Sequence, residues 1–75
     1  MPSKKYRVRV IDYKSGKGET SHNKVFNNID DAEMDYAELS TRYASWGYRI
    51  GHYDIHTIQA KKSENEYSVI ELIQI

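Results

Sequence analysis

The alternation of hydrophobic and polar positions predicts strands at both ends of the chain. In residues 5–13, KYRVRVIDY, apolar and polar side chains alternate and several are β-branched, which is typical of a strand. Tyr6, Val8 and Val10 then share one face, because neighbouring side chains on a strand point to opposite sides. The segment YSVIELIQI at 67–75 has apolar residues at both odd and even positions, as a central strand buried on both faces does.

The intervening sequence predicts two further strands. The glycine-containing segment KSGKGE at 14–19 is typical of a turn, and TSHNKVF at 20–26 follows it as a mostly polar edge strand. A long strand, YRIGHYDIHTIQA, is predicted over 48–60. Its apolar positions shift phase twice along its length, and a bulge near Gly51 would explain the first shift. The polar segment KKSENE at 61–66 then predicts a turn.

A helix is predicted between these pairs of strands. Asp30 as N-cap and Glu33 three residues later form a capping box, and Ile29 and Met34 occupy the positions of a hydrophobic staple. Gly47 is a natural residue to end the helix. The apolar and aromatic positions make one helical stripe; they are 29, 32, 36, 39, 43 and 46.

These elements define an α+β fold in the order ββαββ. We expect a single domain over 1–75, with 1–4 as a flexible N-terminus. The first and last strands are the most apolar, so we expect them side by side and parallel in the middle of a four-stranded sheet, with the helix on one face. This is a β-grasp-like arrangement. A fully antiparallel sheet in another order is the alternative.

One helix covers only one face of such a sheet. The last strand offers Ile70 and Leu72 on one face and Val69, Ile73 and Ile75 on the other, and the sequence does not say which set the helix covers. An uncovered apolar set of this kind favours a partner. The predicted interaction surface is drawn from Ile70, Leu72, Ile73 and Ile75, and its partner is another protein or a second copy of the chain.

Composition narrows the possible chemistry. The 75 residues include no cysteine, which excludes disulfides and thiolate ligands or nucleophiles. No apolar run is long enough to cross a bilayer and no signal-peptide pattern is present, so we expect a cytoplasmic protein (in the host cytoplasm if it is viral) with no membrane partner. The formal charge is zero. It is unevenly spread: residues 1–24 are mainly basic and residues 28–46 mainly acidic.

The first hairpin supports a nucleic-acid hypothesis. Two arginines and a tyrosine share one face of the first strand, and two lysines lie in the adjoining turn. Cations bind phosphate and aromatic rings stack on bases. Against this hypothesis, the chain as a whole is neutral and its helix acidic, so a solvated outer face is the alternative. The residues concerned are Arg7, Arg9, Tyr13, Lys14 and Lys17, with Tyr53 or Tyr67 as possible extensions.

The segment HYDIH contains the ingredients of a metal site. In a strand, His52, Asp54 and His56 would share one face, and two imidazoles with a carboxylate suit Zn or Fe. The alternative is that Tyr53 and Ile55 point towards the helix while the polar set faces water. No fourth ligand is identifiable from the sequence, and no cofactor is expected.

No catalytic motif is recognisable. SGKGET lacks the pattern of a phosphate-binding loop, and nothing pairs a nucleophile with a base. The segment YASWGYRI resembles small prokaryotic and phage domains built from a strand, a helix and a hairpin, a resemblance that implies an architecture and no activity. We therefore expect a non-enzymatic protein-interaction or regulatory module, a homodimer, by analogy a phage-type inhibitor of a host protein. A nucleic-acid binder and a metal or small-molecule binder are the alternatives.

Overall fold

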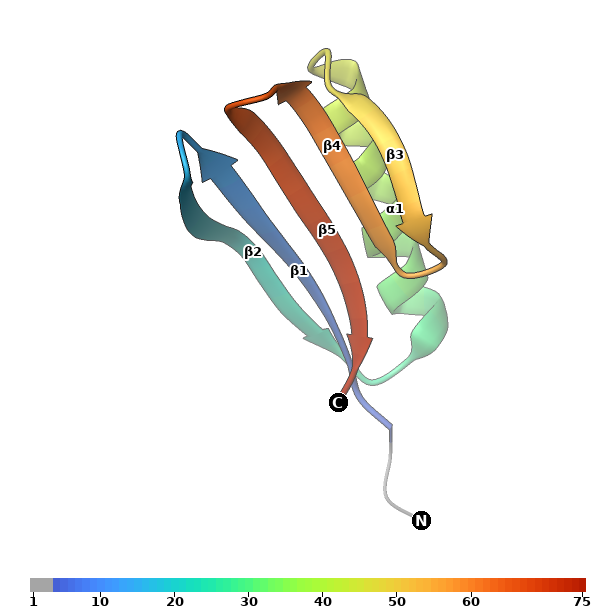
Figure 1. Ribbon diagram of the computed structural model, residues 1–75. Helices are drawn as coiled ribbons and strands as arrows, with labels where there is room; N and C mark the ends of the chain where they lie inside the picture. The colour runs from blue at the N-terminus through green and yellow to red at the C-terminus, as the bar shows by residue number, and fades with distance from the viewer. Residues whose placement is uncertain (1–3) are drawn as a thin grey trace.

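The computed structural model describes residues 4–75 and shows one helix packed on one face of a five-stranded antiparallel sheet (Figure 1). The strand order is β2-β1-β5-β4-β3. Three residues of the predicted flexible N-terminus, 1–3, lie outside the described part. The elements are β1 (Tyr6–Lys14), β2 (Lys17–Phe26), α1 (Ile29–Ser45), β3 (Arg49–Asp54), β4 (Thr57–Ser63) and β5 (Glu66–Gln74).

The prediction of four strands was wrong, because the segment 48–60 forms a hairpin. Chain reversal occurs at Ile55 and His56, between β3 and β4. The Asp54 carboxylate stabilises the turn by accepting a 2.7 Å hydrogen bond from the backbone N–H of His56. The turn contains neither glycine nor proline, so the usual signals of a hairpin are missing. The bulge expected near Gly51 lies later, between His52 and Asp54.

The extra reversal changes the direction of the last strand. As predicted, the first and last strands are neighbours in the middle of the sheet, and all nine residues of β1 pair with β5. Their predicted parallel direction was wrong: the register runs antiparallel from Tyr6 opposite Gln74 to Lys14 opposite Glu66. The central pair is therefore not that of a β-grasp arrangement. The sheet is fully antiparallel, as in the alternative, but its order keeps the first and last strands in the middle.

The core lies between α1 and the sheet. Buried side chains from three strands and from α1 meet there, and the predicted helical stripe supplies the helix side except for Trp46, which follows α1 and is 58 % exposed. Ile29 and Tyr36 pack against this core from its margin. The fully or nearly fully buried apolar residues are Val8, Val10, Ala32, Leu39, Tyr43, Ile58, Ala60, Ile70 and Leu72.

The N-terminal end of α1 differs from the prediction in its N-cap and its staple, whereas the C-terminal end agrees with it. Asn28, not Asp30, is the N-cap, and its side-chain oxygen accepts a 2.7 Å hydrogen bond from the N–H of Asp30. Met34 is 71 % exposed, so it forms no hydrophobic staple. Gly47 has φ = +90°, a conformation that favours glycine, and the helix ends just before it as expected.

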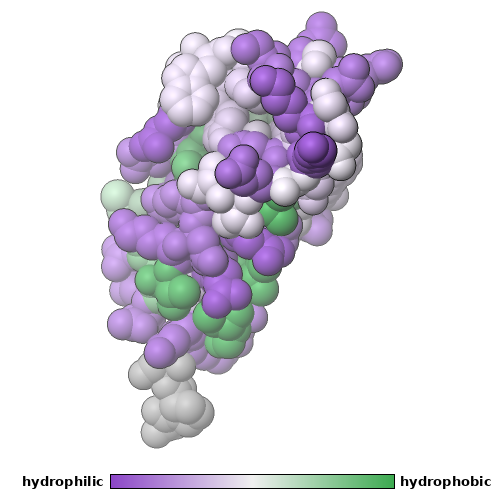
Figure 2. All heavy atoms as spheres, turned by 90° about the vertical axis from the view of Figure 1, so that its left-hand side faces the viewer, coloured by the Kyte–Doolittle hydropathy of each residue, from purple (hydrophilic) through white to green (hydrophobic). Residues whose placement is uncertain are grey.

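The two edge strands are β2 and β3. Strand β2 is exposed along most of its length, as its polar sequence predicted. The view onto the β2 side shows mainly hydrophilic side chains, with hydrophobic groups gathered towards the end of the molecule where β5 ends (Figure 2). No helix within residues 4–75 is long and apolar enough to cross a membrane.

A partly buried tyrosine of α1 gives a testable pH dependence. The hydroxyl of Tyr36 is buried without a hydrogen-bond partner, and burial, with a smaller effect of the Asp54 carboxylate, raises its pKa from 10.0 to about 12. The folded protein therefore holds this proton more tightly than the unfolded chain does. The associated stability is present below pH 10 and is lost as the pH rises towards about 12.

We expect Tyr36→Phe to reduce this alkaline loss of stability, because it removes the titrating group and no hydrogen bond. Urea unfolding measured at several pH values up to about 12 checks it. Burial also raises the pKa of Tyr43 and of Tyr48, so part of the pH dependence remains. Tyr53→Phe, in a side chain that is 68 % exposed, is the control. The same alkaline slope in Tyr36→Phe and wild type would refute the assignment.

Candidate binding surface on the open sheet face

The sheet face opposite α1, called here the open face, is not covered by any element of residues 4–75 (Figure 1). Its side chains alternate along the strands with those of the core. On the central strands most are partly buried, because they shield one another without a covering layer. On β1 they are Arg7, Arg9, Ile11 and Tyr13; on β5 they are Tyr67, Val69, Glu71 and Ile73.

One row of this face runs across four strands and combines two aromatic with two basic side chains. Tyr13 lies opposite Tyr67, Tyr67 opposite Lys61, and Lys61 opposite Arg49. We call these four residues the aromatic–basic row. The rings of Tyr13 and Tyr67 are stacked, with centroids 4.9 Å apart and planes 18° from parallel. The row therefore places a ring stack directly beside two cations.

Gly18 on β2 fixes one side of this stack. It lies opposite Tyr13, and a Cβ atom at this position would stand 2.8 Å from Cε1 of the Tyr13 ring. Such an approach is closer than van der Waals contact allows, so any residue other than glycine would displace the Tyr13 ring. Tyr13 is consequently held between Gly18 and Tyr67. The second face of the Tyr67 ring has no aromatic partner in the described part of the chain.

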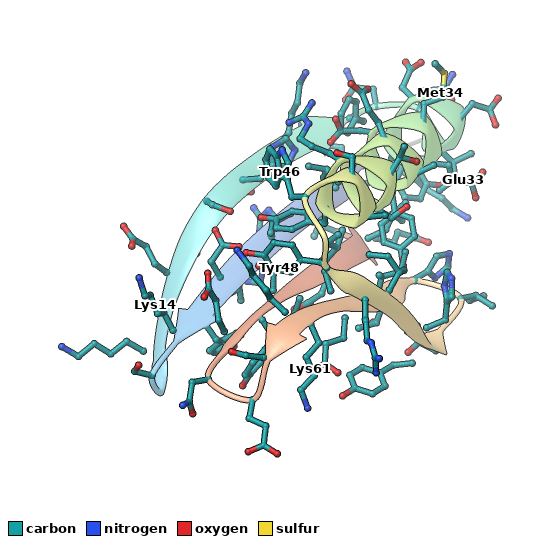
Figure 3. The ribbon with its side chains drawn as sticks, turned by 90° about the horizontal axis from the view of Figure 1, so that it is seen from above. Lys14, Glu33, Met34, Trp46, Tyr48 and Lys61 are labelled. Carbon is teal, nitrogen blue, oxygen red and sulfur yellow. The ribbon has the colours of Figure 1, made fainter. Side chains whose placement is uncertain are left out.

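The basic half of the row is electrostatically unfavourable on its own. Arg49 and Lys61 are direct neighbours across β3 and β4, and like charges in this position repel. Both are exposed, and neither forms an ion pair with another of residues 4–75. Lys61 points away from the helix (Figure 3). The next residue, Lys62, lies over the ring of Tyr48, with its Nζ 5.7 Å from the ring centroid.

The other half of the open face is a mixture of apolar and basic side chains. Arg7 lies between Val25 and Ile73, and Arg9 forms a 3.2 Å ion pair with Glu71. The Nε atoms of both arginines are buried without a hydrogen-bond partner, as expected where an arginine stem lies along apolar surface. The paired positions of this face carry four basic side chains and two acidic ones: Arg7, Arg9, Arg49, Lys61, Asp54 and Glu71.

The structure divides the predicted nucleic-acid residues between two sides of the sheet. Arg7, Arg9 and Tyr13 share the open face, as expected. Lys14 and Lys17 are opposite each other at the hairpin end, and Lys14 lies on the helix side (Figure 3). The five residues therefore do not form one contact surface.

Two tyrosines named as extensions do lie on the open face, and sequence analysis missed two cations. Tyr67 is in the aromatic–basic row, and the hydroxyl of Tyr53 donates a 2.7 Å hydrogen bond to Gln59 Oε1. Arg49 and Lys61 were missed because the segment 48–60 was taken as one strand. Only the hairpin brings them opposite each other.

The predicted apolar interaction surface is also divided. Ile70 is fully buried and Leu72 is 5 % exposed, so both belong to the core beneath α1. Their predicted place on a docking surface needs correction, because no partner can reach them in the folded chain. Ile73 lies on the open face, and Ile75, which follows β5, is 52 % exposed.

The predicted metal residues do not converge. His52 is in β3, His56 is in the turn, and the Asp54 carboxylate is engaged by the turn backbone. Among residues 4–75, no group of three histidine, aspartate or glutamate side chains is close enough to hold a metal ion. The reason is the chain reversal, which removes the shared strand face that the prediction assumed.

Two hollows lie elsewhere on the molecule. The larger, of about 650 Å³, is at the β1–β2 hairpin end, where Lys14 and Lys17 are balanced by Asp12 and Glu19. The smaller, of about 250 Å³, lies between the end of α1 and β2 and is bounded by Trp46. Neither concentrates one sign of charge in the way that the open face does.

Comparisons with family models, with curated proteins and with solved structures find no significant match to this chain. The surface that combines apolar side chains, a ring stack and an excess of cations is the open face.

Proposed function

We propose that the protein is a non-enzymatic binding module and that the open face is its docking surface for an anionic macromolecule. The observation that carries this proposal is the composition of that face. A soluble domain rarely leaves a wide, partly apolar sheet face without a partner. Here the apolar side chains are accompanied by four basic groups and two acidic groups, Asp54 and Glu71, and this excess of positive charge favours a negatively charged partner.

The hydrogen-bonded polar clusters on the helix side support a binding role over catalysis, because their contacts join elements of the fold. The Asp12 carboxylate accepts hydrogen bonds from the hydroxyls of Tyr43 and Ser68, which links β1 to α1 and β5. His22 and Asp35, 2.8 Å apart, join β2 to α1.

Charge also bears on the expected homodimer. A twofold pairing of open faces would bring two sets of four basic side chains together, which opposes association. Docking of the acidic α1 of one copy on the open face of another would be a head-to-tail contact, which forms open chains unless the rotation closes. We therefore favour a partner other than the chain itself, and the homodimer remains a prediction from the sequence.

Amide chemical-shift mapping of the ¹⁵N-labelled protein tests the proposal. Three additions are compared: a single-stranded oligonucleotide, polyglutamate, and more of the unlabelled protein. We expect at least one of the two anionic additions to perturb amides along β5 and β4, and none of the three to act mainly on the outer side of α1 around Met34. Perturbations confined to α1 or to the Trp46 hollow, or none with any probe, would refute the proposal.

A further inference from the structure

We infer that the occupant of the open face is single-stranded nucleic acid, an inference that rests on the proposed function and specifies its partner. The aromatic–basic row is the observation behind it. A ring stack flanked by unpaired cations combines two groups that recognise different parts of a nucleotide. Rings stack on bases, and cations bind the phosphates between them.

The cations of the row are available to phosphate. Arg49 and Lys61 repel each other across β3 and β4 and have no carboxylate partner in residues 4–75. A phosphate between them would relieve this repulsion. Arg9, by contrast, is paired with Glu71. The strongest phosphate contacts therefore belong to the β3–β4 side of the face.

The aromatic side chains offer one free stacking surface next to these cations. Tyr13 is confined between Gly18 and Tyr67, whereas the second face of the Tyr67 ring lacks an aromatic partner. The register places Lys61 on the other side of Tyr67 from Tyr13. A base stacked on Tyr67 would consequently have its backbone near Lys61, and the exposed ring of Tyr53 lies on the same face.

The shape of the face favours a single strand over a duplex. A sheet surface stacks on bases only when they are not already paired and stacked within a double helix. An acidic protein segment would use the cations but would leave the tyrosine rings without a specific role. The acidic face of α1 lies on the opposite side of the sheet, so its repulsion of phosphate restricts binding to the open face.

Fluorescence anisotropy with a labelled single-stranded oligonucleotide of about 12 nucleotides tests the inference. We expect Tyr67→Ala to weaken binding about 5- to 150-fold, the range for loss of one stacked base, and Tyr67→Phe to retain most of the affinity. The double change of Arg49 and Lys61 to Gln should reduce the salt dependence by about 1.4 in the log–log slope, the amount for two phosphate contacts with a single strand.

Lys62→Gln is the matched control, because Lys62 is the neighbour of Lys61 and lies instead over Tyr48. It should leave affinity nearly unchanged. Equal losses for Lys61→Gln and Lys62→Gln, or equally tight binding of a duplex of the same length, would overturn the inference. If polyglutamate binds the open face and the oligonucleotide does not, the inference fails while the proposed function stands. If only a second copy binds that face, both fail. If nothing binds that face, both fail.

Discussion

Ile70→Ala is expected to lower the free energy of unfolding by about 2–5 kcal/mol, the usual cost of truncating a large buried aliphatic side chain. Ile70 is fully buried on the central strand β5, where it lies opposite Val10 and Ile58. A domain of this size has a total stability of only about 4–11 kcal/mol. The loss is therefore a large fraction of the whole. Urea unfolding followed by the fluorescence of Trp46, the only tryptophan, measures it.

Ile73→Ala on the same strand is the control. Ile73 lies on the open face, where the neighbouring side chains and not the helix shield it. Its truncation should cost about 1 kcal/mol or less. Similar losses for Ile70→Ala and Ile73→Ala would mean that the open face is covered in solution and would contradict the assignment of core and surface.

Asp12→Ala is expected to cost about 2–4 kcal/mol of stability, although it removes a charged residue from a partly exposed strand end. The Asp12 carboxylate accepts a 2.8 Å hydrogen bond from the Tyr43 hydroxyl and a second from the Ser68 hydroxyl. Tyr43 and Ser68 are 7 % and 2 % exposed. The substitution leaves two nearly buried donors without an acceptor, and each carries a desolvation cost.

Two comparisons separate this network from simple loss of charge. Glu71→Ala breaks the partly exposed ion pair with Arg9 and should cost less than about 1 kcal/mol. The triple change of Asp12→Ala, Tyr43→Phe and Ser68→Ala should cost less than the sum of the three single changes, because it leaves no orphaned donor. Thermal or urea unfolding measures both. Strict additivity would contradict the network.

The sequence predicts the local elements better than their assembly. Period-two alternation located β1, the continuous apolar run located β5, and the helical stripe located α1. The hairpin at Ile55 and His56 left only a phase shift between Ile55 and Ile58, which does not by itself distinguish a turn from a bulge. Its turn is held by the Asp54 side chain and contains neither glycine nor proline. Missing that one reversal changed both the number of strands and the direction of β5.

The candidate surface was predictable only within single strands. Alternation alone placed Arg7, Arg9 and Tyr13 on one face. The contacts that give the face its character lie across strands, such as the stack of Tyr13 on Tyr67 and the juxtaposition of Arg49 with Lys61. These depend on register, which the hydrophobic pattern fixes only when every strand is identified.

Photochemical cross-linking to an oligonucleotide carrying a photoreactive pyrimidine tests the central claim most directly, because it reports which residue touches a base. The cross-linked peptides are identified by mass spectrometry. We predict adducts at Tyr67, with Tyr53 as the further candidate on the same face, and their loss in Tyr67→Ala. Adducts confined to α1 (Ile29–Ser45), or adduct formation that Tyr67→Ala leaves unchanged at every site, would contradict the account.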